Sequence, residues 1–165
     1  MAVSEPKSFG VVFLVVAVAG LAPALSGAPE VGPPPAGGTS EGVAAGDSVK
    51  AVVHAFHDAL AAGDSARALE LLHPEVRVFE SGHAETLAEY RSGHLAADIA
   101  FSRAVERTVL GEHVSGGERR TLYLSEYRMS GTFRGEDVEL HGTETMALVR
   151  TDAGWRIRHI HWSSR

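Results

Sequence analysis

Apolar residues recur at helical spacing near the start of the part of the chain that is expected to fold. The positions are Val49, Val52, Val53, Phe56 and Leu60. They predict a helix with one apolar face, which Asp47 or Ser48 can cap and Gly63 can end. A second, shorter helix is predicted to follow at once and to stop at Pro74, because proline cannot continue a helix. The pattern therefore indicates a helical hairpin.

The pattern after the hairpin predicts one strand and one unusual helix. Residues 76–80 alternate in polarity, which is typical of a short strand. A third helix is predicted from about residue 84 to residue 101, with an apolar arc that comprises Leu87, Tyr90, Leu95, Ile99 and Phe101. His94 and Asp98 fall in the middle of that arc. Two polar side chains are thus expected where this helix is driest.

The remainder of the chain alternates with a period of two residues and is divided by glycine-rich turns. It predicts four antiparallel strands in a meander, at about 105–114, 119–131, 137–150 and 155–163. Strands of this length favour a curved sheet with bends near Gly131 and Gly142. The element order predicts an α+β domain in which helices cover one face of the sheet.

The last of these strands carries candidate chemistry. Strict alternation places Trp155, Ile157, His159, His161 and Ser163 on one face. A face that is apolar at one end and carries two imidazoles at the other is typical of a pocket wall. Ile160 and Trp162 fall on the opposite face, where they favour association with a second copy through the outer side of the sheet.

Composition narrows the classes of function. The chain has 165 residues, 44% of them hydrophobic, and a formal net charge of −6. Its basic residues are scattered, and Arg119-Arg120 is the only adjacent pair, so nothing indicates binding to nucleic acid. The absence of cysteine excludes disulfides, thiolate nucleophiles and thiolate metal sites. Any metal site has to use His, Asp and Glu.

The N-terminal third divides into two segments that precede the domain. Residues 1–28 combine Lys7, a broken apolar run and small residues at candidate cleavage positions, which together predict a signal peptide. Residues 29–46 are rich in proline and glycine and are interpreted as a flexible linker. The folded domain is predicted at 47–165. The mature protein is expected in the periplasm or outside the cell, with no stable membrane insertion after cleavage.

The element order and several short motifs resemble the nuclear transport factor 2-like superfamily. The motifs are Ala61-Ala62-Gly63-Asp64, Val78-Phe79-Glu80-Ser81-Gly82, Glu144-Thr145-Met146 and the closing Trp-x-Ile-x-His-x-His-x-Ser of residues 155–163. The chain is most similar to exported bacterial SnoaL-like members and to the association domain of calcium/calmodulin-dependent kinase. The resemblance implies a cystatin-like α+β roll, a cone-shaped cavity between the sheet and the long third helix, and dimers packed through sheet faces. It implies no single activity.

The resemblance brings the candidate site residues to one cavity. His94 and Asp98 are expected to face His159 and His161, and these four are the candidate catalytic residues. Candidate ligand-binding residues are Tyr90, Tyr127, Trp155, Met146, Glu80, His83 and Glu144. The inward face of the strand that carries Glu144 is not fixed by its pattern. The other histidines, including His54 and His57, are expected at the surface.

Three interpretations of these residues remain open. In the first, Asp98 orients His94 and one strand histidine in a purely structural hydrogen-bond network. In the second, the pocket binds a small apolar or carbonyl-bearing ligand, with or without isomerase, lyase or cyclase-like acid–base chemistry and without an organic cofactor. In the third, the same residues hold zinc or copper. A homodimer is expected, and an assembly module without catalysis is the alternative class of function.

Overall fold

The computed structural model describes residues 40–165, with side chains from residue 46 onward. The predicted signal peptide therefore lies outside the described residues. Helix α1 spans Ser40–Ala62 and so begins inside the stretch interpreted as a linker, before Asp47. Among the described residues, no helix is both long and apolar enough to cross a membrane.

The predicted helical hairpin is present. Helix α1 buries Val49, Val53, Phe56 and Leu60 in the core, which confirms its apolar face. Gly63, with a φ of +79°, turns the chain between α1 and α2 (Ser65–Leu71). The side chain of Asp64 caps α2 by accepting a hydrogen bond from the backbone of Arg67.

The prediction of one long third helix at residues 84–101 is wrong. Strand β1 spans Leu72–Glu80, and residues His83–Thr86 form strand β2, which pairs antiparallel with it. Helix α3 (Leu87–Ser92) and helix α4 (His94–Ser102) follow in place of one helix.

Two local signals explain this break. Thr86 and Glu89 form a reciprocal capping box that starts α3 immediately after β2. Gly93 then takes φ −119° and ψ −90°, which interrupts the helical path before α4. His94 therefore does not share a helical face with residues of α3, as the prediction of one helix required. His94 and Asp98 do lie one turn apart within α4.

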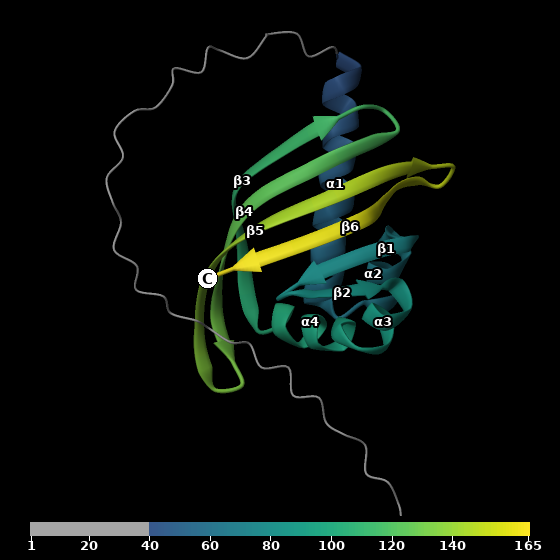
Figure 1. The fold of residues 1–165 in the computed structure, drawn as a ribbon. Helices are drawn as coiled ribbons and strands as arrows, with labels where there is room; N and C mark the ends of the chain where they lie inside the picture. Colours follow the sequence, from purple (N-terminus) through teal and green to yellow (C-terminus); the bar gives the residue numbers. More distant parts are fainter. Residues whose placement is uncertain (1–39) are drawn as a thin grey trace, which may run out of the picture.

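The four-strand meander is confirmed. Its strands are β3 (Val105–Gly116), β4 (Arg120–Phe133), β5 (Glu136–Thr151) and β6 (Gly154–Ser164). They join β1 and β2 in a six-stranded mixed sheet of order β2-β1-β6-β5-β4-β3, in which only β1 and β6 run parallel. The sheet is curved and open, and α1 crosses its concave side (Figure 1).

A β-bulge in β6 reverses the faces expected for its second half. Leu148 pairs with Ile157, but the next residue along β5, Ala147, pairs with His159, so Arg158 is an extra residue. Ile157 and Ile160 are consequently both buried, and Trp162 points toward the helices. The expected placement of His159 and His161 on the pocket face is therefore wrong. The expected outer-face position of Ile160 and Trp162 is wrong for the same reason.

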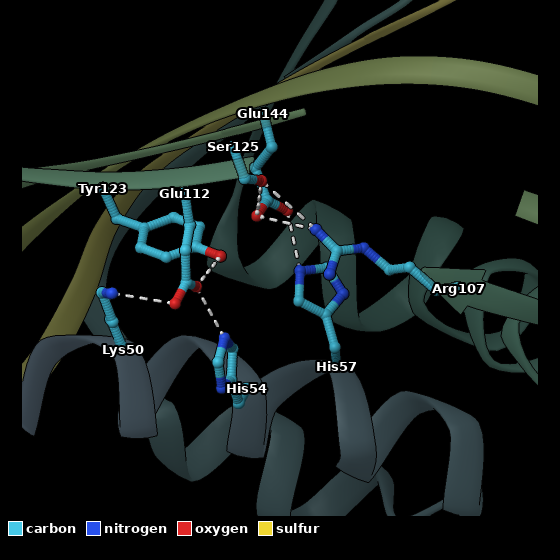
Figure 2. A network of polar contacts seen from close by, with 8 residues as sticks. All are labelled: Lys50, His54, His57, Arg107, Glu112, Tyr123, Ser125 and Glu144. Atoms are coloured by element: carbon cyan, nitrogen blue, oxygen red, sulfur yellow. Dashed lines mark hydrogen bonds and ion pairs between the residues drawn. The ribbon is translucent and has the colours of Figure 1, made fainter. Parts of the chain in front are cut away.

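Strand β3 contains a second irregularity of the same kind. Val109 pairs with Tyr127 and Gly111 pairs with Glu126, which leaves Leu110 as the extra residue. In a regular strand of the same sequence, Arg107 and Glu112 would lie on opposite faces, because they are an odd number of residues apart. Because of the bulge, both side chains lie on the concave side of the sheet, where they contact residues of α1 and β5 (Figure 2).

Candidate functional site

A small pocket opens between the end of α1, helix α4 and the concave face of the sheet. Its volume is about 60 Å³. The apolar part of its lining is formed by Leu60, Phe101, Met129, Leu140 and Trp162. The polar part is formed by His57, Glu80, Asp98, Ser102, Tyr127 and Ser164. A hollow in which polar groups converge against an apolar wall is typical of a ligand site.

Asp98 brings a carboxyl group into this pocket from α4. The hydroxyl of Tyr90, a fully buried residue of α3, donates a hydrogen bond to Asp98 Oδ2 at 2.8 Å. Burial raises the pKa of Asp98 to about 6, although the Tyr90 hydrogen bond and the nearby His94 oppose the shift. Near neutral pH this carboxylate is therefore a stronger proton acceptor than an ordinary aspartate.

Glu80 supplies the second carboxyl group, from the last residue of β1. Burial, followed by the negative charge of Asp98, raises its pKa to about 7. Within residues 46–165 its carboxyl group takes part in no hydrogen bond or ion pair. Two carboxyl groups with raised pKa values that face one hollow can share a proton near neutral pH.

Tyr127 completes the polar part of the pocket from β4. Its ring lies against Gly142 of β5, where an added Cβ would come within 2.3 Å of the ring, so only glycine leaves room for it. The guanidinium carbon of Arg107 lies 4.7 Å from the ring centroid. Burial raises the pKa of Tyr127 to about 12, which keeps its hydroxyl protonated as a hydrogen-bond donor.

Glu144 is the centre of a buried polar network behind the pocket (Figure 2). Its side chain is fully buried, and its Oε2 atom accepts hydrogen bonds from His57 Nε2 at 2.8 Å and Trp162 Nε1 at 2.6 Å. Its Oε1 atom lies 3.3 Å from both Arg107 and Ser125. Burial works against the charge, but His57 and the other donors hold the pKa of Glu144 below its ordinary value.

This network orients two side chains that line the pocket. His57 and Trp162 both contact the hollow, and both are anchored by Glu144. A second cluster continues along α1, where Glu112 accepts from Lys50 and His54 at 2.9 Å each and from Tyr123 at 3.0 Å. Polar contacts thus tie α1 to the sheet along the same side that carries the pocket.

The structure brings only some of the predicted site residues together. Asp98, Glu80 and Tyr127 line the pocket, Tyr90 contacts Asp98, and Glu144 contacts two lining residues. The predicted residues that do not line it are His94, His159, His161, His83, Trp155 and Met146.

The reasons for these departures are local. His94 pairs through Nδ1 with Glu85 at 2.6 Å, and that hydrogen bond raises its pKa. The side chain of His159 lies on the outer face of the sheet near Phe79, with ring centroids 5.1 Å apart. Partial burial lowers the pKa of His159. His161 and His83 are exposed, whereas Trp155 and Met146 belong to the hydrophobic core.

This arrangement changes the three interpretations. The metal set expected from His94, Asp98, His159 and His161 does not converge, because β6 turns its two histidines to the outer face; within residues 46–165 no other group of three suitable side chains does so either. A buried network is present, but it is centred on Glu144 and not on Asp98. The two carboxyl groups in the pocket remain suited to proton transfer.

His57 and Trp162 are the principal pocket residues that sequence reasoning missed. His57 lies between Phe56 and Leu60 at the edge of the apolar face of α1, so its partial burial follows from helical spacing. A signal for Trp162 was also present, because the apolar residues of β6 change from odd to even positions between Ile157 and Ile160. Such a change of phase is typical of a bulge.

Comparisons with known proteins agree with this geometry. The family model described as a SnoaL-like domain matches residues 49–165. A candidate ketosteroid isomerase from Shewanella frigidimarina is 29% identical, with a TM-score of 0.67, and the match covers 70% of this chain and 94% of that one. No curated protein matches.

Two more distant structures share the fold. The association domain of C. elegans CaMKII is 19% identical, with a TM-score of 0.62, and the match covers 76% of this chain and 99% of that one. A candidate dehydratase of the NTF2-like family from Streptomyces avermitilis is 18% identical, with a TM-score of 0.60, and the match covers 73% and 96%.

Replacement of the central carboxylate tests the network. Glu144→Gln should lower the free energy of unfolding by about 3 kcal/mol, because it leaves the largely buried Arg107, whose side chain is 13% exposed, without its counter-charge. Urea unfolding at pH 7 measures the change. Glu139→Gln is the matched control, since it removes an exposed ion pair with Arg128 and should cost less than about 1 kcal/mol. Equal losses in the two variants would contradict a structural role for Glu144.

The raised pKa of Glu80 predicts a pH-dependent stability. A carboxyl group whose pKa rises on folding, here from 4.5 to about 7, binds more protons in the folded state between these pH values, so the fold loses stability as pH rises from 4.5 to about 7. Glu80→Gln should therefore gain about 1–2 kcal/mol over the wild type at pH 8 and almost nothing at pH 5. Urea titrations at both pH values measure this. An identical gain at pH 5 and pH 8 would show that ionisation is not the cause.

Proposed function

Because the chain belongs to the SnoaL-like domain family, we propose that its pocket binds a small, largely apolar ligand with a carbonyl group and transfers a proton on it. The observation that carries this proposal is the pair Asp98 and Glu80, two carboxyl groups with raised pKa values in one apolar-walled hollow. Groups of this kind are tuned for acid–base work near neutral pH.

The two carboxyl groups take different roles. Asp98, with the lower pKa, is ionised at pH 7 and accepts a proton from the carbon next to the carbonyl group. Protonated Glu80, together with the hydroxyl of Tyr127, donates a hydrogen bond to the carbonyl oxygen as negative charge develops there. The proton then returns from Asp98 to the ligand, either to the same carbon or to another, so the enzyme ends in its starting state.

The walls of the pocket support the same chemistry. Trp162 and Phe101 give it an apolar lining, and an apolar lining keeps the two carboxyl groups poorly hydrated. The cavity of about 60 Å³ is well below the ~300 Å³ that suits a drug-sized ligand. The proposed ligand is therefore a small ketone or aldehyde and not a steroid, even though the candidate isomerase from Shewanella frigidimarina supports proton transfer as the type of reaction.

Proton exchange tests this proposal with a defined probe. The full chain should accelerate the replacement of the α-protons of cyclopentanone by deuterium in D₂O, followed by proton NMR. Asp98→Asn should lower that rate by about 10²–10⁴-fold. The rate should rise with pH through about 6, as Asp98 ionises, and fall above about 7, as Glu80 loses its proton.

A control variant separates the site from the bulk of the protein. Asp58→Asn replaces an exposed aspartate of α1 and should leave exchange unchanged. Exchange no faster than in buffer alone, or equal rates for the Asp98 and Asp58 variants, would refute catalysis by the pocket.

A homodimer through the outer face of the sheet is a second candidate property. One row of paired residues crosses that face and contains Phe79, His161, Thr145, Leu124 and His113. Phe79 and Leu124 are 36% and 37% exposed, and large apolar side chains on one face favour association. The similarity in fold to the association domain of C. elegans CaMKII also supports an assembly role.

A charge placed in this row tests the dimer. Leu124→Asp should convert a dimer to a monomer in sedimentation velocity, because two copies would bury unpaired carboxylates. Leu110→Asp is the matched control, since Leu110 is exposed at the bulge of β3 and lies outside the row. A wild-type chain that sediments as a monomer, or a dimer that persists in Leu124→Asp, would reject this interface.

A further inference from the structure

A groove of about 410 Å³ lies at the opposite end of β6 from the pocket, near the β3–β4 and β5–β6 turns. It is distinct from the pocket and shares no lining residue with it. Its lining includes His73, Arg119, Arg120, Arg150, Thr151 and Arg158. Arginines from three separate stretches of the sequence thus meet at one place in the fold.

The charge of this groove is unbalanced. Four arginines line it, and among the side chains that the structure describes Glu75 is the only carboxylate that does so. Glu75 is already paired with Arg158, through its side chain at 2.8 Å and through its backbone carbonyl. Among residues 46–165, no carboxylate forms an ion pair with the other three arginines. A chain with a net charge of −6 therefore carries a local excess of positive charge here.

Strand pairing fixes the backbone of these arginines. Arg120 pairs with Val149, and the backbone N–H of Arg150 donates to the carbonyl of Arg119 at 2.9 Å. Arg158 is the bulge residue of β6. Arg120 shares the outer face with Val149, whereas Arg150 lies on the other face, with its guanidinium carbon 5.7 Å from the Trp155 ring centroid. Arg120 therefore starts from a rigid sheet edge on the side of the apolar stretch, which lowers the entropy lost when it closes on a ligand.

The groove continues into an apolar stretch on the outer face of the sheet. The adjoining hollow shares Arg120, Val149 and Arg158 with the basic groove, and its floor includes Leu122 and Ala147. Leu122 and Ala147 are cross-strand partners, and Leu122 is 43% exposed. One continuous surface thus offers a cluster of guanidinium groups at one end and apolar side chains at the other.

We propose that this groove binds a small organic anion, whose carboxylate or phosphate group is held by Arg119 and Arg120 and whose apolar part lies against Leu122 and Ala147. Guanidinium groups match the planar fork of a carboxylate and the oxygens of a phosphate. The site takes a free small molecule and not a lipid bilayer, because its arginines surround a hollow of ligand size, within the usual ~300–1,000 Å³.

Calorimetric titration of the full chain with decanoate tests the site. Arg119→Gln/Arg120→Gln should weaken decanoate binding at least tenfold, because charge-assisted hydrogen bonds are lost. Arg128→Gln, which removes another exposed arginine of β4 outside the groove, should leave it unchanged. Leu122→Ser should weaken binding of decanoate but not of inorganic phosphate. Thermal melting verifies that each variant is folded.

Further arms distinguish the groove from other sites. Decyltrimethylammonium has a similar apolar chain with a positive head group and should not bind there. Binding should persist in Leu124→Asp, which shows that one copy suffices, and in Asp98→Asn, which shows that the pocket is not the site.

Several outcomes would overturn the proposal. These are no decanoate binding at millimolar concentration, equal binding by the groove variant and Arg128→Gln, equal binding of the cationic analogue, loss of binding in Leu124→Asp or Asp98→Asn, or attachment to phosphatidylglycerol vesicles without binding of free decanoate. None of these bears on proton exchange by the pocket.

Discussion

The need to neutralise one buried carboxylate shapes much of the domain. Glu144 is fully buried between the sheet and α1, and an ionised group in that position is costly unless several donors surround it. The donors come from α1, β3, β4 and β6, namely His57, Arg107, Ser125 and Trp162. One charge therefore specifies how the long helix lies on the sheet, and it holds two pocket side chains at the same time.

The domain contains two kinds of buried carboxyl group with opposite electrostatic situations. Glu144 is surrounded by donors, which lower its pKa and make it a structural anion. Asp98 and Glu80 have few partners, and burial raises their pKa values toward neutrality. The first kind stabilises the fold, whereas the second costs stability and retains reactivity, as is common at functional sites.

Sequence patterns predicted the elements better than the directions of their side chains. Helical and period-2 spacing located the hairpin and the four-strand meander, because those patterns reflect burial directly. The prediction of one third helix was wrong because the capping box at Thr86 and the break at Gly93 are local signals, and they do not disturb the apolar pattern on which the prediction rested. The predicted faces of His159 and Trp162 were wrong because a single extra residue, Arg158, reverses the alternation beyond it. The groove was unpredictable, because only the pairing of β4, β5 and β6 brings Arg120, Arg150 and Arg158, which are far apart in the sequence, to one end of the sheet.

The bulge at Arg158 also constrains how this chain can change during evolution. Outside the bulge, each residue inserted or deleted within β6 exchanges the inner and outer faces of everything beyond it. Loss of Arg158 itself would make the strand regular and leave Trp162 on the inner face, whereas loss of His161 would turn Trp162 outward, away from Glu144. The two-residue turn at Arg134 and Gly135, between β4 and β5, carries no such penalty, because both strands have already left the core there. Length variation among descendants of this chain should therefore be tolerated at that hairpin, whereas within β6 it should be tolerated only at the bulge.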